Sequence, residues 1–191
     1  MKVVSSPRYA IDIGPHVFPT EKYRGISDRL LATSRPGLAG IVAPQAAAWD
    51  ELGLVHTAAY LDKVRTLSLS SEEIVELQLP LNAPIVEGFR LMTGGTLTAA
   101  RLGLADGLAC HVGGGFHHAF ANHGEGFCLF NDVVVAARSL KVDMETLPQL
   151  PLTNYMMESP VLFSDTCIGC RKCVDNCPTN CIIMDTGPKE R

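Results

Sequence analysis

The stretch "VGGGFHHAFANHGEGFC", residues 112–128, decides the fold of this 191-residue chain. Two adjacent histidines, His117 and His118, follow three glycines in it. In amide hydrolysis, one imidazole of such a pair takes a proton from the attacking water and the other gives a proton to the leaving amine. A metal ion beside the pair would polarise the carbonyl group and acidify the water. The structural alternative is a turn that holds two hydrogen-bonded histidines and performs no chemistry.

Short apolar stretches alternate with helical patterns around this segment. Alternation of this kind predicts an α/β fold with a mainly parallel sheet and covering helices. Strands are expected at residues 1–4, 40–44 and 107–112. Helices are expected at residues 56–67, after a capping box formed by Ser70 and Glu73, after Asn82 and at residues 133–140.

Two of these helices have a defined apolar face. In residues 56–67, Tyr60, Val64 and Leu67 share one face. Pro84 fits the first turn of the long helix after Asn82, and Asn131 or Asp132 is expected to cap the helix at 133–140. The packed face of the long helix is expected to carry Ile85, Phe89, Met92, Thr96, Ala99 and Gly103.

Charge and hydropathy exclude two classes of partner. The chain has 16 basic and 20 acidic residues, a formal net charge of -4 and no basic stripe, so we expect no nucleic-acid partner. Its apolar runs are shorter than the ~20 residues of a membrane-spanning helix, so we expect no membrane partner. Its N-terminus does not read as a signal peptide, which makes a cytoplasmic location the expectation.

The segment "GGGFHHAFANHGEGFCLFNDVVVAARSL", residues 113–140, resembles the active-site segment of the histone deacetylase family in the arginase/deacetylase superfamily. The likeness extends upstream through "PHVFPTEKYR", "LGLVHTAAYLDKV" and "GGTLTAARLGLADGLA", and it covers about residues 1–141. It is greatest to bacterial and class IV-like members. The resemblance implies an arginase/deacetylase-type parallel-sheet domain that acts on an acyl-lysine-type substrate.

The resemblance also implies roles for four residues. His117 and His118 match the catalytic pair of the family. Gly126 and Phe127 match positions that line the narrow channel for the acyl-lysine stem, where an aromatic wall excludes water and a glycine leaves room for the chain. The alternative for Phe127 is a place in the core, which is the commoner fate of a phenylalanine.

Zinc is expected for the family, but we expect no complete zinc site in this chain. In the family the ligands are an Asp and a His two residues apart, followed by a later Asp, and a later tyrosine stabilises the oxyanion. After His123 the chain contains no histidine, and Tyr155 is its only later tyrosine. Asp132, Asp143 and Glu145 have no metal-ligand spacing with a histidine. Hydrolysis by the chain alone is therefore doubtful.

An incomplete domain of this type would leave one edge of its sheet uncovered. Such an edge invites a homo-oligomer or a complementing chain. The remaining histidines, His16, His56, His111 and His123, are expected to be structural or solvated. Cys110 and Cys128 are expected to be small core residues.

A second motif, "CIGCRKCVDNCP", spans residues 167–178. Its C-x2-C-x2-C-x3-C-P spacing is that of bacterial ferredoxins, and it resembles a ferredoxin-type [4Fe–4S] segment. A zinc knuckle is the alternative, because it too uses Cys-x2-Cys pairs. The last ligand is open: Cys177 is preferred, and Cys181 or a partner chain can also supply it. The expected cluster ligands are Cys167, Cys170, Cys173 and Cys177.

These patterns predict a deacetylase-like domain at residues 1–141, a linker at 142–164 and a small ferredoxin-like iron–sulfur module at 165–191. Two functions follow from them. The first is a deacetylase-family module that carries a cluster-binding segment. The second is an iron–sulfur electron-transfer protein with a redox partner, in which the deacetylase-like part is a scaffold. A third hypothesis is that the chain is a truncated or fused gene product.

Overall fold

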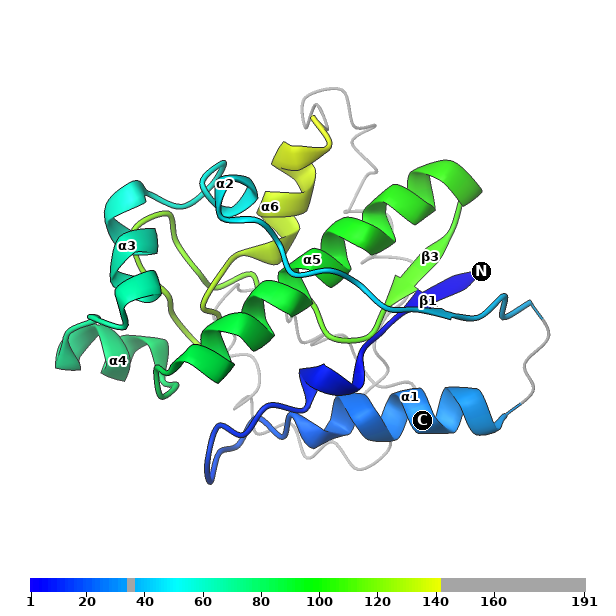
Figure 1. Cartoon of the computed structure of the whole chain (residues 1–191), viewed down its shortest axis with the longest axis horizontal. Helices are drawn as coiled ribbons and strands as arrows, with labels where there is room; N and C mark the ends of the chain where they lie inside the picture. Colours follow the sequence, from blue (N-terminus) through cyan, green and yellow to red (C-terminus); the bar gives the residue numbers. More distant parts are fainter. Residues whose placement is uncertain (34–36, 142–191) are drawn as a thin grey trace, which may run out of the picture. The chain divides into compact units, whose positions relative to one another are not determined.

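A computed structural model describes residues 1–33 and 37–141 of the chain (Figure 1). The linker expected at 142–164 and the module expected at 165–191, with its cysteine ligands, lie outside the described residues. In the part that is described, strands and helices alternate as the sequence predicts. No helix in this part is both long and apolar enough to cross a membrane.

The sheet is small and parallel. Its three strands are β1 (Lys2–Val4), β2 (Ile41–Val42) and β3 (Ala109–His111), in the order β2-β1-β3. Val3 of the central strand pairs with Ile41 on one side and with Cys110 on the other. Among the described residues, β3 pairs with β1 alone, so its outer edge carries no strand. All three strands fall within the predicted stretches.

The long helix α5 (Ala83–Asp106) organises the domain and contacts β1, β3 and α6 (Asp132–Ser139), as Figure 1 shows. It begins where the sequence predicts, because the Asn82 Oδ1 accepts the N–H of Ile85 at 3.0 Å. Ile85, Phe89 and Met92 on its predicted face are fully buried. The other helices are α1 (Glu21–Ala32), α2 (Trp49–Leu52), α3 (Ala58–Thr66), α4 (Ser71–Leu77) and the 3₁₀ turn η1 (Pro7–Tyr9).

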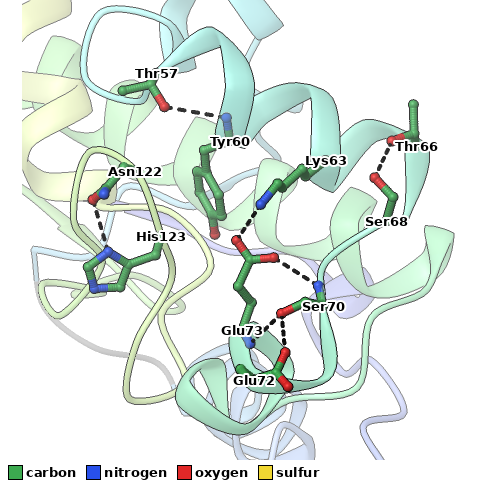
Figure 2. Close-up of polar contacts among 10 residues, drawn as sticks. All are labelled: Thr57, Tyr60, Lys63, Thr66, Ser68, Ser70, Glu72, Glu73, Asn122 and His123. Carbon is green, nitrogen blue, oxygen red and sulfur yellow. Dashed lines mark hydrogen bonds and ion pairs between the residues drawn. The ribbon is translucent and has the colours of Figure 1, made fainter.

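Helices α3 and α4 form a corner that polar contacts hold together (Figure 2). Ser70 and Glu73 form the predicted capping box at the start of α4, with the Ser70 N–H donating to Glu73 at 2.8 Å. Lys63 of α3 pairs with the same Glu73 carboxylate at 2.8 Å. The prediction for Leu67 is wrong: it ends α3 in a left-handed conformation and lies 44% exposed, whereas Tyr60 and Val64 are buried.

Helix α1 was not among the predicted elements. Its core contact comes from Tyr23, which packs edge-on against Tyr9 with the ring centroids 6.0 Å apart. The Ser27 hydroxyl, one turn later, bonds to the Ser5 hydroxyl in the segment after β1. Serine and tyrosine on a largely polar helix give little apolar periodicity, and the pattern therefore does not reveal the helix.

The expectation that both isolated cysteines are core residues is right for one of them. Cys128 is 4% exposed and belongs to the core. Cys110 is exposed, whereas its neighbours on the short strand β3, Ala109 and His111, are partly buried. Along a strand with one solvated face, only every second side chain points toward the core.

Candidate active site

A buried carboxylate fixes the loop that leads to the histidine pair. Asp132, at the start of α6, is fully buried, and its two oxygens accept the N–H groups of Gly115 at 3.0 Å and Phe116 at 2.7 Å. The hydroxyl of Thr96 donates to the same carboxylate. Burial raises the pKa of Asp132, while these hydrogen bonds act in the opposite direction. The backbone immediately before His117 is therefore tied to α6.

A polar chain continues from Asp132 into the core. Because the Thr96 hydroxyl proton goes to Asp132, His111 Nδ1 donates to Thr96 Oγ1 at 3.0 Å. His111 Nε2 then accepts from the Tyr9 hydroxyl at 2.9 Å. Burial lowers the pKa of His111 to about 4, and it raises the pKa of Tyr9, so both side chains are neutral. His111 is structural, as expected.

The two histidines of the pair lie against one another and face solvent. Their ring centroids are 4.3 Å apart, and the ring planes meet at 34°. His117 Nδ1 donates to the carbonyl of Gly115 at 3.0 Å. That bond fixes the neutral tautomer, because a carbonyl oxygen only accepts, and it leaves the His117 Nε2 lone pair able to take a proton. The geometry suits one step of acid–base catalysis.

His56 holds the residues that flank the pair. It is 3% exposed, and its Nδ1 donates to the carbonyl of Phe120 at 2.9 Å while its Nε2 accepts the N–H of Asn131 at 3.1 Å. Burial lowers the pKa of His56. The ring therefore stays neutral, with one donor nitrogen and one acceptor nitrogen for these two bonds. Its partners lie 64 and 75 residues away, so no local pattern in the sequence reveals this role.

Gly126 and Phe127 occupy the centre of a tight turn. Glu125 and Cys128 exchange backbone hydrogen bonds of 3.2 and 2.9 Å across it. The two central residues have φ values of 54° and 68°, and positive values at both positions are what a type I′ turn requires. This conformation is uncommon for a phenylalanine. The bond from the Phe127 N–H to the carbonyl of Leu77, 3.0 Å long, holds it there.

The structure brings this turn to the histidine pair. A Cβ atom added to Gly126 would lie 3.3 Å from Cγ of His118, so only a glycine fits without displacing the ring. The half-buried ring of Phe127 stacks on Phe18 at 6.2 Å and meets His16 edge-on at 4.7 Å. His16 is therefore a structural partner of the turn. All four residues singled out in the sequence lie in one region.

The described residues do not form a metal site at the histidine pair. In residues 1–33 and 37–141, one group of three His, Cys, Asp or Glu side chains has its ligand atoms within 4.8 Å of one another. That group is Glu76, His123 and Glu125, and neither His117 nor His118 belongs to it. A cavity of about 580 Å³ is lined by other residues, including Ala47, Glu51, Gly94 and Arg101.

Comparison with known proteins shows which families the chain resembles. The profile of the histone deacetylase domain matches residues 16–147, and that of the 4Fe-4S binding domain matches residues 160–183. The chain is 38% identical over 112 residues to the acetoin utilization protein AcuC of Bacillus subtilis, covering 53% of this chain and 29% of AcuC. It is 31% identical over 125 residues to Histone deacetylase 2 of Arabidopsis thaliana, covering 62% of this chain and 32% of that protein.

A solved structure shares the fold. The HDAC homologue from Aquifex aeolicus superposes with a TM-score of 0.56 at 22% identity, over 73% of this chain and 41% of that one. The chain spans less than half the length of the curated relatives it matches. The matched profile covers most of the chain and includes the histidine pair and the turn. The chain belongs to the histone deacetylase family.

Proposed function

We propose that this chain supplies the acid–base histidines of an acyl-lysine amidohydrolase site, and that the metal ligands of that site come from outside these 191 residues. The observation that carries the proposal is the contact of His118 with the turn at Gly126 and Phe127. It puts a proton-transfer pair beside an aromatic wall and a glycine gap. An extended acyl-lysine stem needs both features.

The pair divides proton transfer between its two rings. His117, with Nδ1 bonded to Gly115, has its Nε2 lone pair available to take a proton from water. His118, whose ring lies next to Gly126, is the proposed donor of a proton to the leaving amine. General acid–base catalysis alone contributes about 10²–10⁴-fold. Polarisation of the amide is the larger missing contribution, and a metal ion would supply it.

The direct test is complementation. The chain is co-expressed with the C-terminal part of a related deacetylase domain, and turnover of an acetyl-lysine peptide is measured. We expect turnover that His118→Ala reduces by at least about 100-fold, in line with the usual contribution of a general acid. Turnover that is unchanged in His118→Ala would contradict the proposal.

A second function concerns the C-terminal segment. The match of a 4Fe-4S profile to residues 160–183, which include Cys167, Cys170, Cys173 and Cys177, favours a [4Fe–4S] cluster and a redox partner for it. Under this reading the family domain ends near residue 141, and residues 142–164 join it to the cluster segment. Under this proposal the tight Cys-x2-Cys-x2-Cys run supplies the first three ligands of the cluster. Cys177 is the preferred fourth ligand, with Cys181 or a partner chain as the alternatives.

Metal analysis of anaerobically purified protein tests this second function. We expect iron and sulfide in equal amounts, and we expect Cys170→Ala to abolish the broad visible absorption of the cluster. Cys110→Ala is the matched control, because Cys110 is exposed on β3 and outside the motif. Stoichiometric zinc without sulfide would contradict the assignment.

A further inference from the structure

Three potential metal ligands meet on the outer side of the turn that carries Gly126 and Phe127. His123 Nε2 lies 3.6 Å from a carboxylate oxygen of Glu76 in α4 and 3.7 Å from one of Glu125. The three ligand atoms all lie within 4.8 Å of one another. A single ion bound at about 2.0–2.2 Å to each group fits between atoms at such separations after small side-chain shifts.

The second nitrogen of His123 fixes the ring so that Nε2 faces the two carboxylates. His123 Nδ1 lies 2.9 Å from Oδ1 of Asn122, the bond drawn in Figure 2. An amide oxygen only accepts, so Nδ1 carries a proton, and Nε2 is the ring nitrogen that faces the two carboxylates. Metal-ligating histidines usually have their other ring N–H bonded in this way.

A positive charge would be stabilised where these three groups meet. Two carboxylates and an imidazole lone pair are all acceptors, and they repel one another without positive charge between them. Among the described residues, neither Glu76 nor Glu125 pairs with a lysine or an arginine. In contrast, Glu73 on the same helix is neutralised by Lys63. The remaining candidates for the positive charge are a proton on Nε2 and a bound metal ion.

The backbone holds the three ligands in place. Between His123 and Glu125, Gly124 is so tightly packed that an added Cβ would lie 2.7 Å from the Tyr60 hydroxyl and 2.8 Å from Leu77. The N–H of Gly126 donates to the carbonyl of Glu76 at 3.4 Å, which joins the turn to α4. The His123 ring stacks on Phe120 at 4.6 Å. These contacts fix the backbone positions from which the three ligands extend, and a binding site needs such support.

We propose that Glu76, His123 and Glu125 bind a divalent transition metal ion, with Zn²⁺ as the best match, separate from the histidine pair and from the cysteine motif. One imidazole and two carboxylates are ligands that zinc accepts, and three protein ligands leave a position for water. The ion joins α4 to the turn whose Gly126 contacts His118. It therefore stabilises the region that carries the candidate active site.

The test is zinc binding by the full chain with its cysteine segment loaded with iron and sulfide. Zinc is titrated against a chromophoric zinc indicator under anaerobic conditions, and the thermal midpoint is measured with and without zinc. We expect the parent chain to bind one more equivalent of zinc than His123→Gln. We also expect Glu125→Gln and Glu76→Gln to weaken this binding at least 10-fold. Zinc is expected to raise the thermal midpoint of the parent chain and to leave that of His123→Gln unchanged.

Glu72→Gln is the matched control, because Glu72 is an exposed carboxylate on the same helix that bonds to Ser70 rather than to His123. It is expected to bind zinc as the parent chain does. The thermal midpoint of each variant without zinc shows whether that variant folds. Because three different ligands are replaced, the test still holds if one of the variants fails to fold. Equal zinc stoichiometry in the parent chain and His123→Gln would overturn the proposal, since a proton alone would then occupy the site. Equal weakening by Glu72→Gln would also overturn it.

Discussion

The carboxylate of Asp132 accepts the backbone N–H of Phe116 at 2.7 Å, one residue before the histidine pair. It also accepts the N–H of Gly115 and the hydroxyl of Thr96. A fully buried side chain in α6 thus sets the position of His117, which lies on a different segment. Three donors depend on this one acceptor, and the N–H of Phe116 is the buried one.

We expect Asp132→Ala to destabilise the chain by about 2–4 kcal/mol, because a buried donor left without a partner costs about 1–3 kcal/mol. Urea unfolding followed by circular dichroism measures the change. Asp106→Ala is the control: its carboxylate makes a surface ion pair with Lys2, 2.9 Å long, and such pairs contribute less than about 1 kcal/mol. Equal effects of the two substitutions would show that the buried network contributes little.

Stability is expected to fall as the pH is lowered from 6.5 to about 4. Burial lowers the pKa of His111 from 6.5 to about 4, so the unfolded chain takes up a proton in this window before the folded chain does. A shift of this size corresponds to about 3 kcal/mol. Burial also lowers the pKa of His56, so His56 adds to the loss of stability as the pH falls. Asp132 opposes it at the acid end, because burial raises the pKa of that carboxyl.

His111→Gln tests the assignment of this pH dependence. Unfolding free energies at several pH values are compared in the parent chain and the variant. The slope between pH 6.5 and 4 should be smaller in the variant, since its side chain does not titrate. An identical slope would mean that His111 is not the group responsible.

Gly126→Ala is expected to disturb the histidine pair in addition to straining the turn. A left-handed φ costs a residue with a Cβ about 1–2 kcal/mol, and the new methyl group would lie 3.3 Å from His118 Cγ. Gly14→Ala is a matched control, because Gly14 also has a positive φ but no heavy atom within 4 Å of an added Cβ. Both variants should lose stability. Only Gly126→Ala should shift the imidazole NMR signals of His118, and unchanged signals would count against the contact.

The outer edge of β3 pairs with no strand among residues 1–33 and 37–141, and we expect this edge to make the chain self-associate. Leu108, which precedes this strand, is 60% exposed, and Leu104 at the end of α5 is 71% exposed. Exposed apolar residues beside an unpaired strand edge favour edge-to-edge pairing. Sedimentation velocity over a range of concentrations should show association that Leu108→Lys reduces. Val75→Lys, at a residue of α4 that is 74% exposed, should have no such effect. A monomer at every concentration would contradict the prediction.

Local signals in the sequence predicted all three strands and the helices α3, α4, α5 and α6, but not α1 or α2. Asn131 and Asp132 were the two candidates for the cap of α6, and Asn131 is the residue whose side chain accepts the N–H of Val134 at 3.2 Å. The capping box at Ser70 and the start of α5 at Asn82 are confirmed as predicted. Each depends on residues three positions apart, and a spacing of that kind can be read directly from a sequence.

Contacts between distant segments could not be predicted in this way. Nothing near Asp132 in the sequence indicates that its carboxylate bonds 16 and 17 residues backward to a glycine-rich loop. The meeting of Glu76 with His123 depends on how α4 packs against the turn, and a single sequence contains no such information. The family resemblance located the histidine pair, but its surroundings follow from tertiary packing.

Hydrolysis by the chain alone tests the central claim most directly. The purified chain is incubated with an acetyl-lysine peptide and added zinc, and the amount of deacetylated peptide is measured. His118→Ala is assayed in parallel. We predict a rate no higher than the background in both samples, because His117 and His118 are needed for proton transfer and the described residues offer no metal ligands beside them. Robust turnover that His118→Ala removes would contradict the account and would place a complete metal site within this chain.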